Sequence, residues 1–259
     1  MLKRKKISIR IIIIMIIFMS VGYISMDWLR FYNKPAEIEF LESPFSPYMK
    51  VFVSFLSFLI VWLIGRDFVE KSDAKRLKAA FTFIFIADFL FLLKFNLLGI
   101  AIFSLCQILL IYRNGFGLVD FFRKREWVKY KKNLVIYSVI ALLIGIISLC
   151  FLFRPILKGN SLFYAFIVYA IFLCLSFWTA WVSHLINKLS RLNTYMIAAG
   201  MTLFVLCDLT VGLNLALSAI EKTAKTEFVW MISSSLTWMF YTPALVFLAL
   251  SGYNIQKTN

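Results

Sequence analysis

The sequence predicts an all-α integral membrane protein, a polytopic bundle of eight transmembrane helices. Of its 259 residues, 62% are hydrophobic, and the mean hydropathy is +0.86, whereas a soluble domain is nearer half apolar. The apolar residues gather in eight runs, most of them close to the ~20 residues that a helix needs to cross a bilayer. Most of the 28 Lys and Arg residues lie between these runs. One aqueous core could not bury this much apolar surface, so a soluble protein is excluded.

The eight runs are separated by polar or charged segments within a single integral membrane domain that covers residues 1–259. The first run follows a basic N-terminal segment, but no small-residue cleavage site follows it, so we interpret it as a helix rather than a signal peptide. Residues 26–47 contain three prolines and are expected to form a loop outside the membrane. The predicted spans are residues 7–25, 48–65, 76–93, 97–112, 133–153, 161–185, 194–215 and 228–253.

The distribution of positive charge predicts the orientation. The segments on the side of the N-terminus carry 20 Lys and Arg residues, and those on the other side carry eight. Because cytoplasmic loops are enriched in Lys and Arg, we predict a multi-pass protein of the cell membrane with both termini in the cytoplasm. The same distribution accounts for the net charge of +15 without a nucleic acid partner. Residues 121–132 fit an ordinary basic loop better than a short amphipathic segment on anionic lipid.

Two aspartates stand in the middle of apolar runs and are the first candidates for catalysis. Asp88 lies in the third predicted span and Asp208 in the seventh, and we expect these to be the only carboxylates within the spans. An ionisable group in a bilayer is costly and is usually functional. Both lie ~18–21 Å from the start of their helices. The two helices run in the same direction, 120 residues apart, which is compatible with two parallel halves of four helices each.

Other polar residues in the spans are candidates for binding a substrate. They are Lys50, Gln107, Asn214 and Tyr241. His184 lies at a helix end next to polar residues and fits an interfacial position better than a catalytic one. The four cysteines have no zinc-binding spacing, and the chain lacks a phosphate loop and a nucleophile elbow. We therefore expect neither a metal nor a cofactor.

Four short motifs, in this order and at this spacing, resemble the lysoplasmalogenase (YhhN-like) family of eight-helix membrane proteins. They are Ala87-Asp88-Phe89-Leu90, Gly99-x-x-x-Phe103-x-x-x-Gln107, Cys207-Asp208-Leu209 and Tyr241-Thr242-Pro243-Ala244-Leu245-x-x-Leu248-x-x-Ser251. Lys50 falls on a family lysine. The chain departs from the family pattern at four positions, where Gly, His, Gln and Pro of the family are replaced by Ala87, Gln107, Leu245 and Val51. The resemblance covers nearly the whole chain.

The resemblance implies an activity: cleavage of the vinyl-ether bond of lysoplasmalogens, to a fatty aldehyde and a glycerophospho head group. A lysophospholipid of the membrane would be the substrate. One of Asp88 and Asp208 would act as acid, and the other would stabilise the cation, as paired carboxylates do in glycosidases. Two alternatives stay open. One is a lipid-binding relative without catalysis, which the departures at Gln107 and Leu245 allow, and the other is a proton- or ion-coupled transporter in which Asp88 and Asp208 bind the coupling ion. Neither Asp has an adjacent Gly or Pro, which disfavours the broken helices of a transporter.

Overall fold

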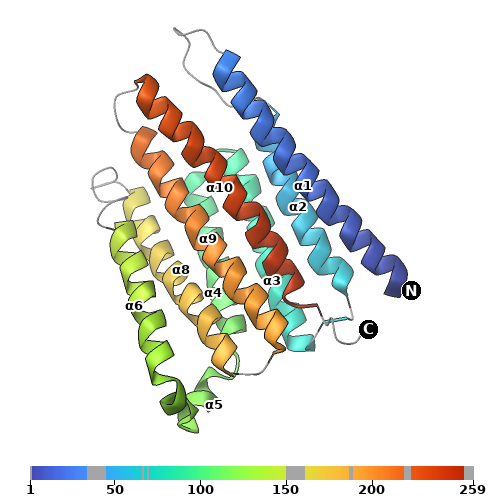
Figure 1. The fold of residues 1–259 in the computed structure, drawn as a ribbon, viewed down its shortest axis with the longest axis vertical. Coiled ribbons are helices and arrows are strands. Elements are labelled where there is room, and N and C mark those ends of the chain that lie inside the picture. The colour runs from blue at the N-terminus through green and yellow to red at the C-terminus, as the bar shows by residue number, and fades with distance from the viewer. Residues whose placement is uncertain are drawn as a thin grey trace.

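The computed structural model describes residues 2–33, 45–65, 67–68, 70–149, 161–186, 189–218 and 223–253, and within them it has helices and no strand. Two short helices, α5 (Leu118–Arg123) and η1 (Glu126–Tyr130), connect α4 to α6. Eight long helices form the bundle in Figure 1. They are α1 (Leu2–Asn33), α2 (Ser46–Ile64), α3 (Lys71–Leu92), α4 (Asn96–Asn114), α6 (Lys131–Ile147), α8 (Ser161–Ile186), α9 (Arg191–Ser218) and α10 (Ala224–Leu250).

Six of the long helices form a closed ring. Each of α2, α3, α4, α8, α9 and α10 packs against the next, and α10 packs against α2 to close the ring. The two remaining helices lie outside it on opposite flanks (Figure 1): α1 packs against α2 and α10, and α6 packs against α8. The ring gives the protein an interior that six helices share.

The order of packing is the one that two parallel halves of four helices would produce. Within each half, the first helix packs against the second, the second against the third, and the third against the fourth. Two of the contacts between the halves, α4 with α8 and α10 with α2, become each other when the two halves are exchanged. The contact of α1 with α10 has no counterpart of similar extent. The third helix of each half carries one of the two aspartates.

Contacts between distant segments place both ends of the described chain at one end of the bundle, called here the terminal end. Lys5 near the start of α1 pairs with Asp67, which follows α2. Phe68 pairs through its backbone with Tyr253, which follows α10. Asn193 at the start of α9 donates to the Tyr253 carbonyl oxygen at 3.0 Å. Helices α3 and α9 therefore both start at the terminal end and run toward the opposite end.

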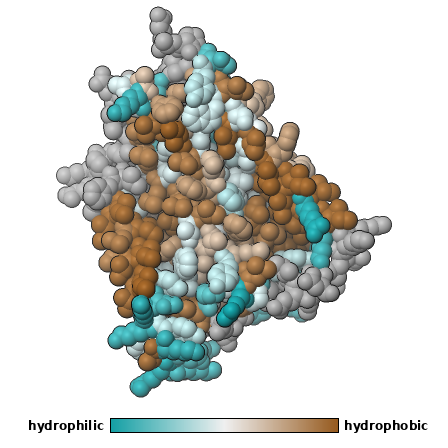
Figure 2. Space-filling model, in the orientation of Figure 1, coloured by the Kyte–Doolittle hydropathy of each residue, from teal (hydrophilic) through white to brown (hydrophobic). Residues whose placement is uncertain are grey.

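The outer surface of the bundle is apolar, as a lipid-facing surface must be. Hydrophobic side chains cover the middle of the molecule in Figure 2, and hydrophilic side chains gather at the lower end, where α5 lies in Figure 1. Side chains such as Phe18 on α1 and Leu142 on α6 are mostly exposed. Seven of the described helices are long and apolar enough to cross a membrane. These features confirm an all-α polytopic membrane protein.

Helix α3, which corresponds to the third predicted span, is not among those seven. Its first two turns carry five charged residues, which lower its mean hydropathy. Beyond Lys78 it is apolar apart from Asp88, and along its length it packs between α2 and α4. It is 22 residues long, enough to span ~33 Å. Its charged turns lie at the terminal end, so we treat α3 as part of the membrane bundle.

The first helix corrects two sequence-based expectations. Residues 26–33 were expected in a loop, but α1 continues to Asn33, because the first helix-breaking proline comes later, at Pro35. The continuation places Asp27 on a helix, with 5% of its surface exposed. The expectation that Asp88 and Asp208 are the only carboxylates within the spans is therefore wrong. Asp27 is stabilised there by Ser46 and Lys50 of α2. The predicted end of the fifth span, residues 150–153, lies outside the described residues.

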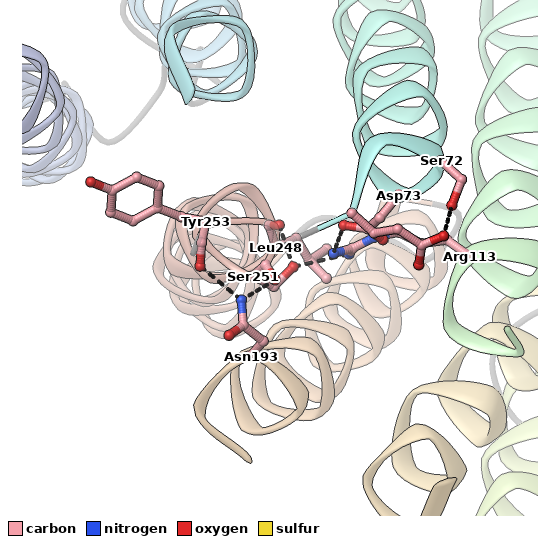
Figure 3. Close-up of polar contacts among 8 residues, drawn as sticks. Ser72, Asp73, Arg113, Asn193, Leu248, Ser251 and Tyr253 are labelled. Carbon is pink, nitrogen blue, oxygen red and sulfur yellow. Dashed lines mark hydrogen bonds and ion pairs between the residues drawn. The ribbon is translucent and has the colours of Figure 1, made fainter. Parts of the chain in front are cut away.

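A buried ion pair joins α3 to α4 at the terminal end. Arg113 donates from Nε to Asp73 Oδ1 at 2.6 Å and from Nη2 to Oδ2 at 3.2 Å. Its Nη1 donates to Ser251 Oγ at 2.9 Å, and Asn193 Nδ2 donates to the Ser251 carbonyl oxygen at 2.6 Å. Figure 3 shows this run of contacts from Asp73 to Asn193. These contacts link four helices of the ring, α3, α4, α9 and α10, at the terminal end.

Candidate functional site

A cavity of about 480 Å³ lies inside the six-helix ring, in the half nearer the opposite end. Every helix of the ring contributes to its wall, and α1 and α6 do not. Most of the wall is apolar or aromatic. The described residues that line it are Pro47, Lys50, Val51, Asp88, Phe91, Leu92, Asn96, Ile100, Phe103, Phe166, Tyr169, Cys207, Asp208, Val211, Asn214, Trp230, Ser234, Thr237, Trp238 and Tyr241. A mostly apolar pocket with a few convergent polar groups is typical of a small-molecule site.

Asp88 reaches the cavity from α3 and is stabilised by two hydroxyl groups. Ser54 on α2 donates a hydrogen bond to Asp88 Oδ2. The Tyr241 hydroxyl on α10 donates to the same oxygen at 2.7 Å. Two donors orient the carboxyl group and offset part of the cost of removing it from water.

Asp208 reaches the same cavity from α9 and has a single tyrosine donor. The Tyr169 hydroxyl on α8 donates to Asp208 Oδ2 at 2.7 Å. The two tyrosines are connected through two phenylalanine rings that contact each other, Phe103 and Phe204. Phe103 contacts Tyr169 with ring centroids 6.3 Å apart, and Phe204 contacts Tyr241 with centroids 5.6 Å apart. Each carboxyl group is thus positioned by a tyrosine of another helix of the ring.

The ring brings the two carboxyl groups together, although they are far apart in sequence. Both line the same cavity. Two like charges in one low-dielectric site favour a state in which only one is ionised. The pair can therefore offer an acid and an anion to a molecule bound between them, which is the division of roles that general acid catalysis with a cationic intermediate needs.

Lys50 lines the cavity from α2 and is 5% exposed. Its ammonium lies 3.8 Å from Asp27 Oδ2 on α1 and 5.1 Å from the centre of the Trp238 ring. Ser46 Oγ donates to the same Asp27 oxygen at 2.9 Å. Among the described lining residues, Lys50 is the one cation.

The other predicted binding residues have different positions. Tyr241 and Asn214 line the cavity, and Asn214 Nδ2 lies 3.5 Å from Thr237 Oγ1. Gln107 does not line it: the side chain is fully buried next to Tyr169, and neither amide atom has a hydrogen-bond partner among the described residues. His184 lies toward the terminal end, where its Nδ1 is 3.0 Å from Thr194 Oγ1.

Four residues in or next to the site were not predicted from the sequence: Ser54, Tyr169, Asp27 and Trp238. A serine in a membrane helix usually bonds to its own backbone, and nothing in the sequence separates Ser54 from the other serines of the spans. Tyr169 did carry a signal, because a tyrosine in the middle of an apolar run has a hydroxyl that needs a partner. Asp27 was assigned to a loop.

The described residues contain no group of three or more His, Cys, Asp and Glu side chains that could hold a metal ion. Among the described lining residues, the polar groups include two carboxyls, one ammonium, two side-chain amides and four hydroxyls. This set is suited to proton transfer and to binding an amphiphile.

Comparison with family models identifies the chain. The model of the YhhN family matches residues 45–252, most of the sequence. The chain belongs to the YhhN family. The match includes Asp88, Asp208 and all six helices of the ring, so the cavity lies wholly within the YhhN region. No curated protein and no solved structure matches the chain.

Helix α1 lies before the matched YhhN region, yet it packs against it closely. Tyr23 is fully buried and contacts Trp238 edge to face, with centroids 5.7 Å apart. Its hydroxyl lies 3.2 Å from Thr242 Oγ1 on α10. Together with the Asp27–Lys50 pair, these contacts attach α1 to the wall of the cavity that the YhhN region forms.

Proposed function

We propose that the protein is a lysoplasmalogenase-like membrane hydrolase, which cleaves the vinyl-ether bond of lysoplasmalogens. The observation that carries the proposal is the pair Asp88 and Asp208 on the wall of one mainly apolar cavity inside a membrane bundle. Membership of the YhhN family and the resemblance to its motifs support the same activity.

The proposed reaction begins with protonation, by one carboxyl group, of the vinyl carbon that is not bonded to the ether oxygen. The carbon bonded to the ether oxygen then becomes an oxocarbenium ion, which the other, ionised carboxylate stabilises. Water adds to this carbon and returns a proton, which forms a hemiacetal. The hemiacetal then loses its hydroxyl proton and breaks its bond to the glycerol oxygen, which takes up a proton, and the products are a fatty aldehyde and the glycerophospho head group. Burial favours the neutral form of one carboxyl group, as an acid requires, and a positioned acid contributes ~10²–10⁴-fold to such a rate.

The apolar wall suits the rest of this substrate. Phe91, Ile100, Phe103, Phe166 and Val211 line the cavity and can contact an alkenyl chain. A cavity within the bundle can receive a lipid from the membrane without transfer through bulk water.

Release of aldehyde tests the proposal directly. Purified protein in lipid vesicles is expected to release fatty aldehyde from a lysoplasmalogen, and none from the saturated 1-O-alkyl analogue, which has no vinyl group to protonate. Absence of aldehyde release, with the lipid still bound, would favour the lipid-binding alternative. Proton-dependent uptake of a solute into the vesicles without aldehyde release would favour the transporter.

We also propose that both termini face the cytoplasm at the cell membrane, on the basis of the charge distribution. The cavity would then lie in the outer half of the membrane, because it is in the half of the ring away from the termini. A reporter that is active only in the cytoplasm, fused after Asn259, is expected to be active. Activity of a periplasmic or extracellular reporter at the same position, with the cytoplasmic one silent, would invert the orientation.

A further inference from the structure

Residues 118–132 connect α4 to α6 at the terminal end, and they form two short helices rather than the basic loop that the sequence favoured. Helix α5 and the 3-10 helix η1 cover most of the segment. Phe121 on α5 is 2% exposed and packs in a cluster with Leu134 of α6, and Trp127 of η1 packs against the same cluster. The segment therefore has a fixed orientation, with one face on the bundle and the other face outward.

The outward face carries six exposed basic side chains. None of them forms an ion pair within the residues that the structure describes, whereas Lys5 and Arg113 at the same end are both paired with aspartates. The segment contains only two acidic residues, so this face is strongly positive. Figure 2 shows hydrophilic side chains gathered at this end of the molecule. The six, called here the basic surface, are Arg123, Lys124, Arg125, Lys129, Lys131 and Lys132.

Exposed apolar side chains lie next to these charges. Val119 on α5 is 71% exposed and lies four residues before Arg123, a spacing that puts both on one face of an α-helix. Val128 on η1 is 57% exposed and lies three residues before Lys131, which is one turn of a 3-10 helix. An apolar side chain beside a cation suits the boundary of a membrane, where the first contacts acyl chains and the second contacts head groups.

Helix α6 sets the depth of the basic surface in the membrane. Lys131 and Lys132 are each followed four residues later by an exposed apolar side chain, Val135 and Ile136. From residue 139 to residue 147 the exposed side chains of α6 are all apolar. Four residues of a helix rise ~6 Å. The two lysines therefore lie within one turn of the lipid-facing surface, at the level of the lipid head groups.

We propose that the basic surface binds anionic phospholipids of the surrounding bilayer, whose phosphate groups pair with its Lys and Arg side chains. These lipids are partners at the outside of the bundle, not the molecule in the ring cavity, so the inference does not depend on the proposed reaction. Charge complementarity selects them, because a zwitterionic head group carries its own cation, whereas an anionic one keeps a net negative charge. A bound lipid contacts both α5 and the start of α6, and it thereby stabilises the attachment of α6, which packs against the ring through α8.

Thermal unfolding of the full chain in two lipid compositions tests the basic surface. We compare vesicles of phosphatidylcholine with vesicles in which part of this lipid is replaced by phosphatidylglycerol. Because a ligand that binds only the folded state raises the unfolding temperature, the wild type is expected to unfold ~3 °C or more higher in the mixture. Lys131→Gln/Lys132→Gln is expected to lose about half of this increase or more. An equal unfolding temperature of the wild type in both vesicles overturns the proposal.

Lys71→Gln/Lys75→Gln is the matched control. It removes two exposed lysines from the start of α3, at the same end of the bundle, so the net charge changes by the same amount. This variant is expected to retain the increase. The increase is measured within each variant, so a change of stability in phosphatidylcholine alone does not affect the comparison. An equal loss in the two double variants would attribute the effect to net charge and would overturn the proposal.

Arg125 offers a variant whose effect differs in sign between the two lipids. Its backbone is in the left-handed region, with φ 55°, which asparagine adopts more readily than arginine. Arg125→Asn is therefore expected to unfold at the same or a higher temperature than the wild type in phosphatidylcholine, and to gain less from phosphatidylglycerol. A gain equal to that of the wild type would exclude Arg125 from the lipid-binding surface.

Two further measurements identify the partner. A phosphatidylglycerol with a photoreactive group next to its head group is expected to label residues 118–136 in the wild type, and to label them less in Lys131→Gln/Lys132→Gln; even labelling of the whole terminal end contradicts the assignment. Glycerol 3-phosphate or a single-stranded RNA, added to protein in phosphatidylcholine, is expected to leave the unfolding temperature unchanged. An increase as large as that from phosphatidylglycerol would assign the surface to a soluble phosphate or to nucleic acid instead of a lipid.

Discussion

Asp88→Asn and Asp208→Asn are each expected to reduce the release of aldehyde from lysoplasmalogen by 10²-fold or more. Asparagine has nearly the same shape as aspartate and can still accept the hydrogen bonds from Tyr241 or Tyr169. It can neither donate a catalytic proton nor carry the negative charge that stabilises an oxocarbenium ion. Turnover by the purified variants in vesicles, measured as aldehyde formed per protein, is the test.

The two variants are expected to remain folded, because asparagine places no charge in the apolar interior. Thermal unfolding in detergent checks this. Asp67→Asn is a matched control: it makes the same chemical change at the terminal end, where Asp67 pairs with Lys5 outside the cavity. It should leave turnover within about twofold of the wild type. Full activity of either cavity variant would rule out the two-carboxylate mechanism and would favour a structural or ion-coupling role.

Asp73→Asn is expected to give the largest loss of stability, about 3–5 kcal/mol in the free energy of unfolding. Arg113 has a fully buried side chain and donates two hydrogen bonds to Asp73. Asparagine leaves the guanidinium charge without its anion in a buried site. The Ser251 hydroxyl remains as a neutral partner, which is too weak to replace the carboxylate. Thermal or denaturant unfolding in detergent measures the loss.

Glu70→Gln is the control for that variant, because Glu70 is exposed just before α3 and accepts a hydrogen bond from the nearby Ser72 hydroxyl. Its stability should be within about 0.5 kcal/mol of the wild type. At temperatures where the Asp73→Asn variant is still folded, the aldehyde release by this variant should be normal, since Asp73 lies at the end of the bundle away from the cavity. An unfolding temperature equal to that of the wild type would show that the ion pair does not hold the ring closed.

The length and position of the apolar runs determined the class of this protein and nearly all of its helices. A helix is the one way for a single apolar segment to satisfy its backbone in lipid, so runs such as residues 161–185 and 228–253 could be placed without tertiary information. The length of the first helix was underestimated, because its last residues are not part of an apolar run. Residues 26–33 are mixed in polarity, and whether they are helical depended on the partners that Asp27 finds on α2, which no local pattern shows.

The candidate site was predictable only in part. Asp88 and Asp208 were recognisable because an isolated carboxylate in an apolar run has few explanations, and Lys50 because it lies on a family lysine near the same depth. The sequence alone could not identify Ser54 and Tyr169 as their partners, because hydroxyls are common in membrane helices. Gln107 was expected at the substrate, but its helix directs it into the packed interior next to Tyr169.

By itself, then, the sequence determined the helical membrane class, the approximate spans and the two aspartates. Each of these depends on the polarity of a residue relative to its own neighbours in the chain. The closure of six helices into a ring, the shared cavity and the attachment of α1 to it through Asp27 and Lys50 were decided only by the tertiary structure. These features depend on which faces of separate helices meet, and in lipid that choice is made by side-chain packing and by the few buried polar contacts rather than by hydrophobicity, since every helix is apolar.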